Sequence, residues 1–502
     1  MNNNTVDVLI VGGGSSGAVL ASRLSENRQR QVILLEAGPT PSSYKYPNIL
    51  ASSNVVGANL NPKYEWGFKT ETGFIKNPIA AIRGKTLGGS SAVNGAVAIR
   101  ARPEDFKRWN LKGWSYEDLL PFFKKLENRH SNHIDTSIHG TSGPFPVVQL
   151  DREDVSTMQH AFIESTLQHG FKYIQDFDGT DANGVGAYSM NIVNGVRVNT
   201  GIAYLHDEVR ARDNLQIIGN QLVDRVLFEG KKAVGIRLAN GEELFAKEII
   251  LSGGTYGSAA ILLRSGIGPK KSSEQLGIPV IADLPVGENL VDHPFYYNAY
   301  AADPEKIGDQ TPVIGAKLWT KSSTSENNEL DLHITATHLF PHELSPTHVG
   351  FVLAVALTRP HSRGRVWIET LDPAVAPKID LNFLAEEHDK SRIVEGIKLA
   401  RKIGQTAPLS DLIHSELAPK TDDDGEILKS IQETIDTYHH PVASAPMGNE
   451  NDPKAVVDLK ANVYGVEGLK VVDASIMPDA VSVATNITTI AIAERIASFY
   501  NN

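Results

Sequence analysis

A glycine turn that directly follows the first β-rich run constrains this chain more than any other feature. Residues 12–17 read Gly-Gly-Gly-Ser-Ser-Gly and fit the pattern G-x-G-x-x-G. In that pattern the glycines allow a tight turn, close approach of the backbone to a pyrophosphate and close helix packing. The run Thr5–Val11 reads as a strand, helical spacing covers Ala18–Leu24, and Gln31–Glu36 reads as a second strand. The sequence therefore predicts a βαβ unit that binds a dinucleotide, whose phosphates face the amides that open the helix.

Glu36 supports this interpretation because it stands 19 residues beyond Gly17, where a carboxylate can accept hydrogen bonds from a ribose diol. A glycine-rich turn without any ligand is one alternative. Another is the nucleophile elbow G-x-S-x-G of α/β-hydrolases, which residues 13–17 also fit, with Ser15 as the nucleophile. An elbow serine normally follows several strands, and the elbow gives Glu36 no role, so dinucleotide binding is the favoured hypothesis.

Further strands and one apolar helix can be predicted along the chain. A meander is expected over Leu215–Ile218, Leu222–Phe228, Val234–Leu238 and Glu243–Phe245, followed by separate strands at Glu248–Leu251 and Leu469–Asp473 and a helix at Asn486–Ser498. Two stretches between these elements are richer in Pro and His. We therefore expect two interleaved domains, the first made of residues 1–154, 205–294 and 438–502 and the second of residues 155–204 and 295–437.

Composition excludes several function classes. The formal net charge of −11 and the lack of Lys/Arg clusters argue against a nucleic-acid partner. No apolar run approaches the roughly 20 residues that cross a bilayer, and no leader pattern is seen, so we expect a cytoplasmic protein without a membrane span. The absence of cysteine excludes disulfides, thiolate metal sites and a Cys nucleophile. The oligomeric state is left open.

Longer motifs resemble those of one enzyme family. Residues 83–95 read Arg-Gly-Lys-Thr-Leu-Gly-Gly-Ser-Ser-Ala-Val-Asn-Gly and resemble the first diagnostic motif of the glucose-methanol-choline (GMC) oxidoreductases. Residues 254–269 are similar to the second motif, although Ala259 stands where the family usually has Pro or Ser. Shorter family-like stretches are Glu36–Gly38, Pro285–Gly287, Asn289–Leu290, Asp292–His293, Ser362–Gly364 and Val471–Ser475. The resemblance spans nearly the whole chain.

The resemblance implies the fold and the cofactor. The expected fold is α/β (α+β overall), with a doubly wound, Rossmann-like FAD-binding domain interleaved with a substrate domain on an antiparallel sheet. The positions that the resemblance assigns to FAD are Gly12, Gly14, Ser15, Ser16, Gly17, Glu36, Ala37, Arg83, Leu87, Gly88, Gly89, Ser90, Asn94, Gly95, Ala96, Val97, Val223, Gly253, Asp473, Ala474, Thr485, Asn486 and Ile487. Some family members attach FAD through a His just before the Asn of the first motif. Val93 occupies that position, so non-covalent FAD is expected.

The catalytic residues are expected near the C-terminal end of the chain. Oxidation of an alcohol requires a base for the hydroxyl proton and a hydride acceptor, which in this family is flavin N5. His440 matches the family's catalytic His, and His439 is the alternative. His439 should point elsewhere if the segment is extended. The second catalytic position, usually Asn or His, falls at Ala484, and Asn486 follows two residues later near the start of the predicted helix.

The predicted function is oxidation of a small or medium alcohol, with oxygen or another acceptor reoxidising FAD. Because Ala484 departs from the family pattern, a hydroxynitrile lyase-like enzyme on the same fold is the alternative. The histidines 333, 338, 342 and 348 lie close in the sequence, but Pro341 interrupts the helix that would place two of them on one face. No metal site is expected.

Overall fold

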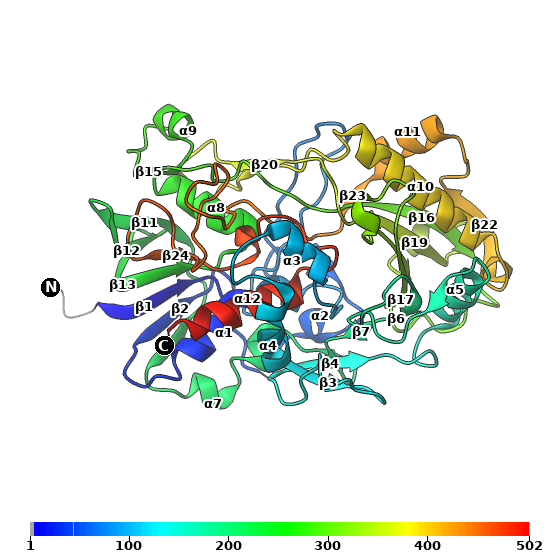
Figure 1. Ribbon diagram of the computed structural model, residues 1–502, viewed down its shortest axis with the longest axis horizontal. Helices are drawn as coiled ribbons and strands as arrows, with labels where there is room; N and C mark the ends of the chain where they lie inside the picture. The colour runs from blue at the N-terminus through cyan, green and yellow to red at the C-terminus, as the bar shows by residue number, and fades with distance from the viewer. Residues whose placement is uncertain (1–4, 44, 501–502) are drawn as a thin grey trace.

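The computed structural model describes residues 5–43 and 45–500 of the chain. Its first sheet has seven strands, in the order β10-β2-β1-β13-β12-β11 with β24 beside β13 (Figure 1). The bounds are β1 Val6–Val11, β2 Val32–Leu35, β10 Leu215–Ile218, β11 Val223–Glu229, β12 Lys232–Leu238, β13 Glu243–Leu251 and β24 Leu469–Val471. The glycine turn joins β1 to helix α1 (Ser15–Leu24), so the predicted βαβ unit is present.

Two details of the predicted meander are wrong. The run Leu215–Ile218 is not part of it, because β10 pairs in parallel with β2 at the edge of the sheet. Residues 243–251 form one strand rather than two. This strand changes partners along its length: Glu243–Phe245 pairs antiparallel with β12, and Ala246–Leu251 pairs in parallel with β1. The change of partner explains why the sequence looks like two separate strands.

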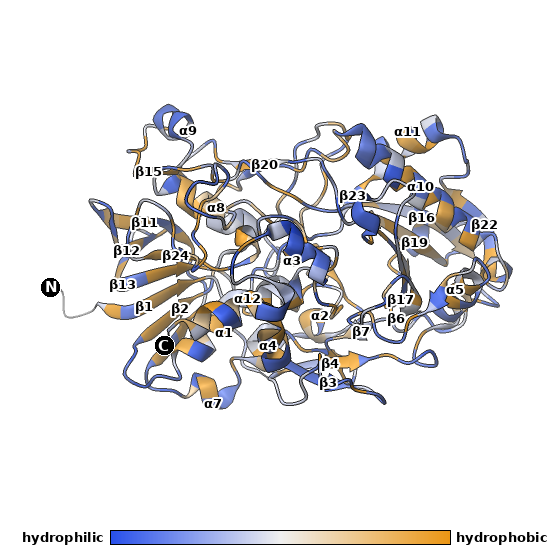
Figure 2. Cartoon of the chain, viewed as in Figure 1, coloured by the Kyte–Doolittle hydropathy of each residue, from blue (hydrophilic) through white to orange (hydrophobic). Residues whose placement is uncertain are grey.

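The helix α12 (Asn486–Ser498) has the bounds that the sequence predicts. It lies beside α1 (Figure 1), and Nη2 of Arg23 in α1 forms an ion pair of 2.7 Å with Oε1 of the fully buried Glu494 in α12. The helices α3 (Pro103–Trp109), α4 (Tyr116–Leu126) and α8 (Gly254–Arg264) complete this half of the molecule. In Figure 2 the strands at the centre of the first sheet carry the hydrophobic colour, whereas α9 (Lys270–Gln275) is hydrophilic.

The second sheet has eight strands, in the order β22-β16-β19-β18-β17-β6-β5 with β23 beside β16. Its bounds are β5 Lys172–Tyr173, β6 Gly184–Ala187, β16 Pro294–Ala302, β17 Ile314–Thr320, β18 Leu332–Thr337, β19 Gly350–Leu357, β22 Ile413–Ala418 and β23 Asp436–Thr437. All pairs are antiparallel except β5 with β6. The helices α5 (Thr157–Leu167) and α10 (Glu387–Gly404) pack against this sheet. The mixed α/β class is therefore confirmed.

Smaller elements connect the two sheets. The remaining strands are β3 Glu127–His130, β4 Phe145–Gln149, β7 Ser189–Met190, β8 Ile192–Val193, β9 Val196–Arg197, β14 Ile267–Gly268, β15 Ala282–Asp283, β20 Arg365–Trp367 and β21 Lys378–Asp380, and the remaining α-helices are α2 Asn48–Ala51, α6 Thr200–Ala203, α7 Asp207–Arg210 and α11 Asp424–Thr434. The hydroxyl of Thr200 in α6 donates to the carbonyl oxygen of Gly14 at 3.4 Å, so part of residues 155–204 packs against the glycine turn. The exact division into two domains stays a prediction. Within the described residues, every helix is too short or too polar to cross a membrane.

Candidate functional site

A cavity of about 650 Å³ lies where the carboxyl ends of β1 and β2 meet the second sheet. Val11 and Leu35 end those two strands and line the cavity on one side, while Lys317, His333 and Thr335 line it from the second sheet. The carboxyl ends of parallel strands are where α/β sheets bind their ligands. The two sheets therefore enclose one site.

The glycine turn forms one end of the cavity. The backbone of Gly12 has φ +98°, and a Cβ there would lie 2.4 Å from the carbonyl oxygen of Ser252. A Cβ at Gly17 would lie 1.8 Å from the carbonyl oxygen of Gly12. Both positions therefore require glycine for close backbone packing. Gly14 precedes α1 and offers no side-chain cap, so the first amides of the helix remain available to a ligand.

Glu36 lies beside this turn and is 5% exposed. Its carboxylate accepts hydrogen bonds from the backbone amides of Gly13 at 2.9 Å and Gly38 at 2.8 Å. Burial raises the pKa of Glu36 above its usual value. The hydroxyl of Ser15 donates to Oδ1 of Asn486 at 2.7 Å, and within the described part of the chain no histidine contacts it. The nucleophile-elbow alternative thus lacks the base that such a serine needs.

Most of the positions expected to bind the cofactor line the cavity. They are Gly12, Gly14, Ser15, Ser16, Glu36, Ala37, Arg83, Gly89, Ser90, Asn94, Gly95, Val97, Val223, Gly253, Asp473, Ala474, Thr485 and Asn486. Five others lie behind the wall: Gly17, Leu87, Gly88, Ala96 and Ile487. Gly17 packs on Gly12, as described above. Leu87 is fully buried, and a Cβ at Gly88 would meet the side chain of Asn199 at 2.5 Å, so these residues support the wall rather than face the cavity.

The wall leaves space for a bound cofactor beside the start of α8. A Cβ added at Gly254 or Gly257 would meet no protein atom within 4 Å, and both residues line the cavity, so their missing side chains leave open space there. Asp473 is fixed beside them, because its Oδ2 accepts hydrogen bonds from the amide of Gly254 at 2.9 Å and the hydroxyl of Ser258 at 2.6 Å. The helix α12 begins at Asn486 without a side-chain cap, and Thr485 and Asn486 line the cavity. The residues present therefore fit a ligand with anionic groups at two helix starts.

His440 lies on the cavity wall between the two sheets. Its Nδ1 is 3.1 Å from Nδ1 of His293, and its backbone amide donates to Oδ1 of Asp292 at 2.8 Å. Burial is the main reason why the pKa of His440 lies well below its usual value, and electrostatic interactions with His293 and Arg83 lower it further. No hydrogen bond reaches its Nε2 from any described residue. This histidine is therefore neutral at pH 7 and has one nitrogen free for a ligand.

The segment around His439 is not extended. His439 has φ +63°, and its carbonyl oxygen accepts a hydrogen bond of 2.7 Å from Nη2 of Arg83. His439 and His440 both line the cavity, and His439 also lines a second, smaller cavity beside residues 432–436. The condition for the expectation about His439 is therefore not met, and the direction of its ring stays a prediction. Burial lowers the pKa of His439 to about 3. Ala484 also lines the cavity, where its methyl group offers no hydrogen bond.

Sequence reasoning missed two groups that act on His440. His293 is fully buried, and burial lowers its pKa to about 3. Asp292 accepts hydrogen bonds from the amide of His293 at 2.7 Å and from the hydroxyl of Thr437 at 2.6 Å, and burial raises its pKa to about 6. The signal was present, because the pair Asp292–His293 is one of the family-like stretches. Its contact with residue 440 required the folded structure.

The four histidines at positions 333, 338, 342 and 348 form no shared cluster of metal ligands among the described residues. His333 lines the cavity, whereas His338 hydrogen-bonds the hydroxyl of Ser156 through Nε2 at 2.8 Å.

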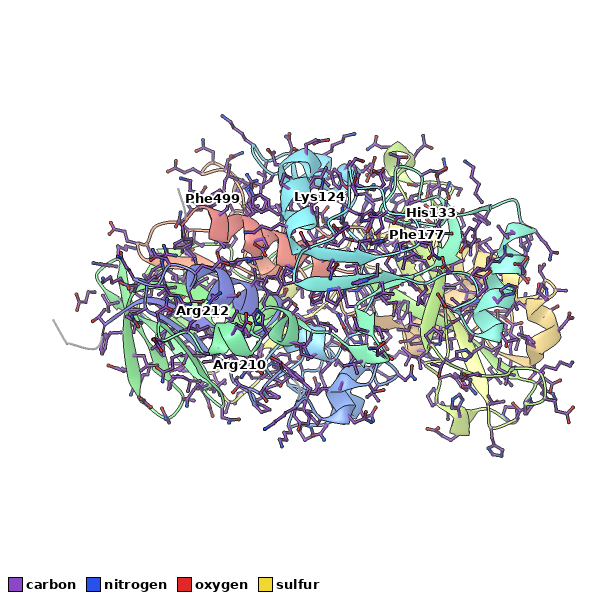
Figure 3. The ribbon with its side chains drawn as sticks, turned by 90° about the horizontal axis from the view of Figure 1, so that it is seen from below. Lys124, His133, Phe177, Arg210, Arg212 and Phe499 are labelled. Carbon is purple, nitrogen blue, oxygen red and sulfur yellow. The ribbon has the colours of Figure 1, made fainter. Side chains whose placement is uncertain are left out.

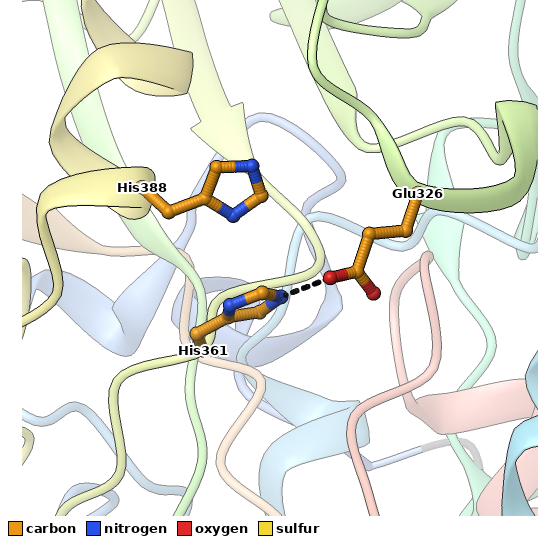
Figure 4. Close-up of side chains that lie close together, drawn as sticks. All are labelled: Glu326, His361 and His388. Carbon is orange, nitrogen blue, oxygen red and sulfur yellow. Dashed lines mark ion pairs between the residues drawn. The ribbon is translucent and has the colours of Figure 1, made fainter.

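In the described ranges two other side-chain groups lie close enough to share a metal ion, namely Glu326 with His361 and His388, and Glu127 with His139 and Asp178. The first lies at the surface, where His361 Nε2 and Glu326 Oε1 are 3.3 Å apart (Figure 4). The second is an ionic network that includes Arg100 and Arg129.

Comparisons with known proteins agree on one family. Residues 6–295 and 360–493 match the two family models described as GMC oxidoreductase. The chain is 35% identical to an oxygen-dependent choline dehydrogenase of Pseudomonas fluorescens over 98% of this chain and 93% of that protein, and 31% identical to one of Photobacterium profundum over 99% and 93%.

Solved structures show the same likeness. The crystal structure of pyridoxine 4-oxidase from Mesorbium loti superposes with a TM-score of 0.90 at 31% identity and 99% coverage of both chains. A formate oxidase from Aspergillus oryzae superposes with a TM-score of 0.88 at 23% identity over 99% of this chain and 98% of that one, which shows the shared fold.

Proposed function

This chain belongs to the GMC oxidoreductases, FAD-dependent enzymes that act on CH–OH groups, and from that premise we propose that His440 removes the hydroxyl proton of a small or medium alcohol. The product is the aldehyde or ketone. The observation that carries the proposal is the position of His440, which lies in the cavity, is neutral, and keeps Nε2 free while Nδ1 is engaged. The chemistry that FAD supplies is acceptance of the hydride at flavin N5.

The contact between Nδ1 of His293 and Nδ1 of His440 requires one neutral ring to donate and the other to accept. In this proposal His293 accepts through Nδ1, which places its proton on Nε2, a buried nitrogen without a hydrogen-bond partner among the described residues. His440 then donates from Nδ1, and the lone pair of its Nε2 points to the substrate hydroxyl. This is the state that a general base requires.

In this proposal His333 makes the second polar contact with the substrate oxygen, which the methyl group of Ala484 cannot make. It lines the cavity from β18, and neither of its buried ring nitrogens has a hydrogen-bond partner among the described residues. The ring of Tyr438 contacts both histidines, with centroids 4.4 Å from His440 and 6.1 Å from His333. A proton on one His333 nitrogen would steady the substrate oxygen while His440 takes its proton.

FAD is held without a covalent bond in this proposal. The amides at the start of α1 and α12 serve its anionic groups, and Glu36 serves the ribose. Val93 is 3% exposed and packs with Leu50 and Ala58, so the position that could carry a covalent link is an inert aliphatic group. Acid precipitation should therefore leave the yellow colour in the supernatant. Colour that stays with the precipitated chain would contradict non-covalent binding.

The decisive experiment is anaerobic addition of alcohols to the holoenzyme. A substrate should bleach the flavin absorption and yield the carbonyl product in equal amount. Cleavage of a hydroxynitrile without bleaching would instead support the lyase alternative, which Ala484 keeps open. Replacing His440 with Ala should lower the rate constant of bleaching by about 10²-fold or more. The His439→Ala variant is the matched control, and a larger loss in that variant would reverse the assignment.

A further inference from the structure

A buried lysine on the cavity wall has no partner. Lys317 lies in β17, its side chain is fully buried, and it lines the cavity. Its Nζ makes no hydrogen bond and no ion pair with any described residue. Buried amines without a partner are rare because they lose their hydration without compensation. The mechanism proposed above gives Lys317 no task.

We propose that Lys317 recognises an acidic group, a carboxylate, on the alcohol that this enzyme oxidises. The inference rests on the proposed function and adds the substrate class: a hydroxymethyl compound whose ring or chain carries an acid away from the reacting carbon. In the complex the carboxylate accepts hydrogen bonds from the ammonium group, and the hydroxyl lies at His440.

The surroundings of Lys317 favour a cation but provide no acceptor. Its Nζ lies 4.0 Å from the ring centroid of Trp319, 4.5 Å from that of Phe177 and 5.7 Å from that of Tyr188. Phe177 lies beside the strands of the second sheet (Figure 3). Aromatic faces attract an ammonium ion, yet they leave its N–H groups without regular acceptors. An oxygen ligand would complete the site.

The nearest carboxylate of the protein is already engaged. Asp178 acts on Lys317 only through its charge. Its Oδ1 accepts the backbone amide of Arg100 at 2.8 Å, and its Oδ2 lies 3.9 Å from Nε of Arg100 and 3.8 Å from Nη1 of Arg129. Arg100 and Arg129 also pair with Glu127 and Asp176, and Nε of Arg102 lies 3.3 Å from Oε2 of Glu104. The carboxylates near Lys317 therefore serve the arginines, and none of them is left for the lysine.

The strand register separates the acid site from the reacting site. Lys317 lies opposite Thr335, and Trp319 lies opposite His333, so Lys317 and His333 stand two positions apart on the same face of the sheet. Burial lowers the pKa of Lys317 well below its usual value, and an incoming carboxylate would stabilise the protonated amine. A substrate that carries both groups can therefore span from His333 to Lys317.

The test compares three probes on the holoenzyme under anaerobic conditions. The probes are 4-(hydroxymethyl)benzoate and 3-(hydroxymethyl)benzoate, which carry the acid, and benzyl alcohol, which does not. Benzoate, which has no alcohol to oxidise, measures binding alone through its perturbation of the flavin spectrum. The variants are Lys317→Met, which keeps the length, and Lys317→Arg, which keeps the charge. Lys63→Met is the matched control, because Lys63 is exposed and lies 5.3 Å from the Tyr64 ring outside the cavity.

The wild type should bind at least one of the two acidic alcohols about tenfold or more tightly than benzyl alcohol, as expected for a charged hydrogen bond. Lys317→Met should remove that preference and the benzoate signal while leaving benzyl alcohol bound as before, and Lys317→Arg should keep part of the preference. Equal binding of acidic and neutral probes, or an acid preference that survives in Lys317→Met, would overturn the inference. Benzoate binding that depends on Lys317 without bleaching by any alcohol would support the acid site and count against the proposed function.

Discussion

Nδ1 of His293 lies 3.1 Å from Nδ1 of His440, and this contact joins the start of the second sheet to the proposed base. The two residues are 147 positions apart in the chain. Asp292 holds both of them, because Oδ1 accepts the backbone amides of His293 and His440. The orientation of the base is therefore set by a buried pair that need not touch the substrate.

Loss of the His293 acceptor should slow catalysis without removing FAD. His293→Leu leaves His440 free to take the wrong tautomer, so the rate constant of anaerobic flavin reduction should fall about tenfold or more. Its dependence on pH should also change, which a merely structural role would not cause. His293→Gln, which can offer an oxygen near the same place, should recover part of the rate. Wild-type rates and pH profile in His293→Leu would refute the positioning role.

Two glycine substitutions should separate folding from cofactor binding. Gly17→Ala places a methyl group 1.8 Å from a backbone oxygen, so this variant should fold poorly. Gly257→Ala meets no atom within 4 Å and lies inside α8, where Ala is favoured over Gly by about 1 kcal/mol. The apoprotein of Gly257→Ala should be at least as stable as the wild type but bind FAD more weakly, because the methyl group fills cofactor space. Fluorescence titration of the apoproteins with FAD measures this difference, and unchanged affinity would contradict the placement of the cofactor.

Stability should fall as the pH drops below about 6.5. Burial lowers the pKa of His338 to about 4 and those of His293 and His439 to about 3, so below 6.5 the unfolded chain binds protons that the folded protein does not. Asp292, with a pKa raised to about 6, opposes this trend in part. Each such histidine contributes about 1.4 kcal/mol per pH unit. When the pH is lowered from 6.5 to 5, the free energy of unfolding in urea should therefore fall by about 2 kcal/mol less in His338→Gln than in the wild type. An identical fall in both proteins would contradict the lowered pKa of His338.

The ionic network around Glu127 should stabilise the protein at neutral and acidic pH and lose that effect as the pH rises. Burial opposes protonation of His139, but hydrogen bonds to Asp176 and Glu127 raise its pKa to about 9. Its stabilising effect is complete below pH 6.5 and is lost as the pH rises through 9. Glu127→Gln should lower the free energy of unfolding by about 3 kcal/mol at pH 7 and weaken this alkaline loss. Urea unfolding at pH 7 and 9 measures both effects, and a variant as stable as the wild type would show that the network contributes little.

Local patterns predicted what depends on local sequence. The glycine turn with its two strands and the bounds of α12 follow from spacing alone, and the family resemblance selects His440, which the structure shows on the cavity wall. The sequence predicts two strands where the structure has the single strand β13, because a change of pairing partner along one strand has no local sequence pattern. The position of His439 depends on a left-handed backbone held by Arg83, and the isolation of Lys317 depends on strands that meet only in the folded sheet. These are tertiary effects, which spacing cannot report.

The packing of α12 against α1 has a consequence for biosynthesis. The cavity wall combines the turn after β1 with Thr485 and Asn486, and the Arg23–Glu494 ion pair locks the two helices together. A ribosome releases residues 486–498 long after β1, so the part of the FAD pocket wall that Thr485 and Asn486 form is absent throughout most of translation. Cofactor capture must therefore come late, and a nascent chain arrested before α12 would emerge colourless.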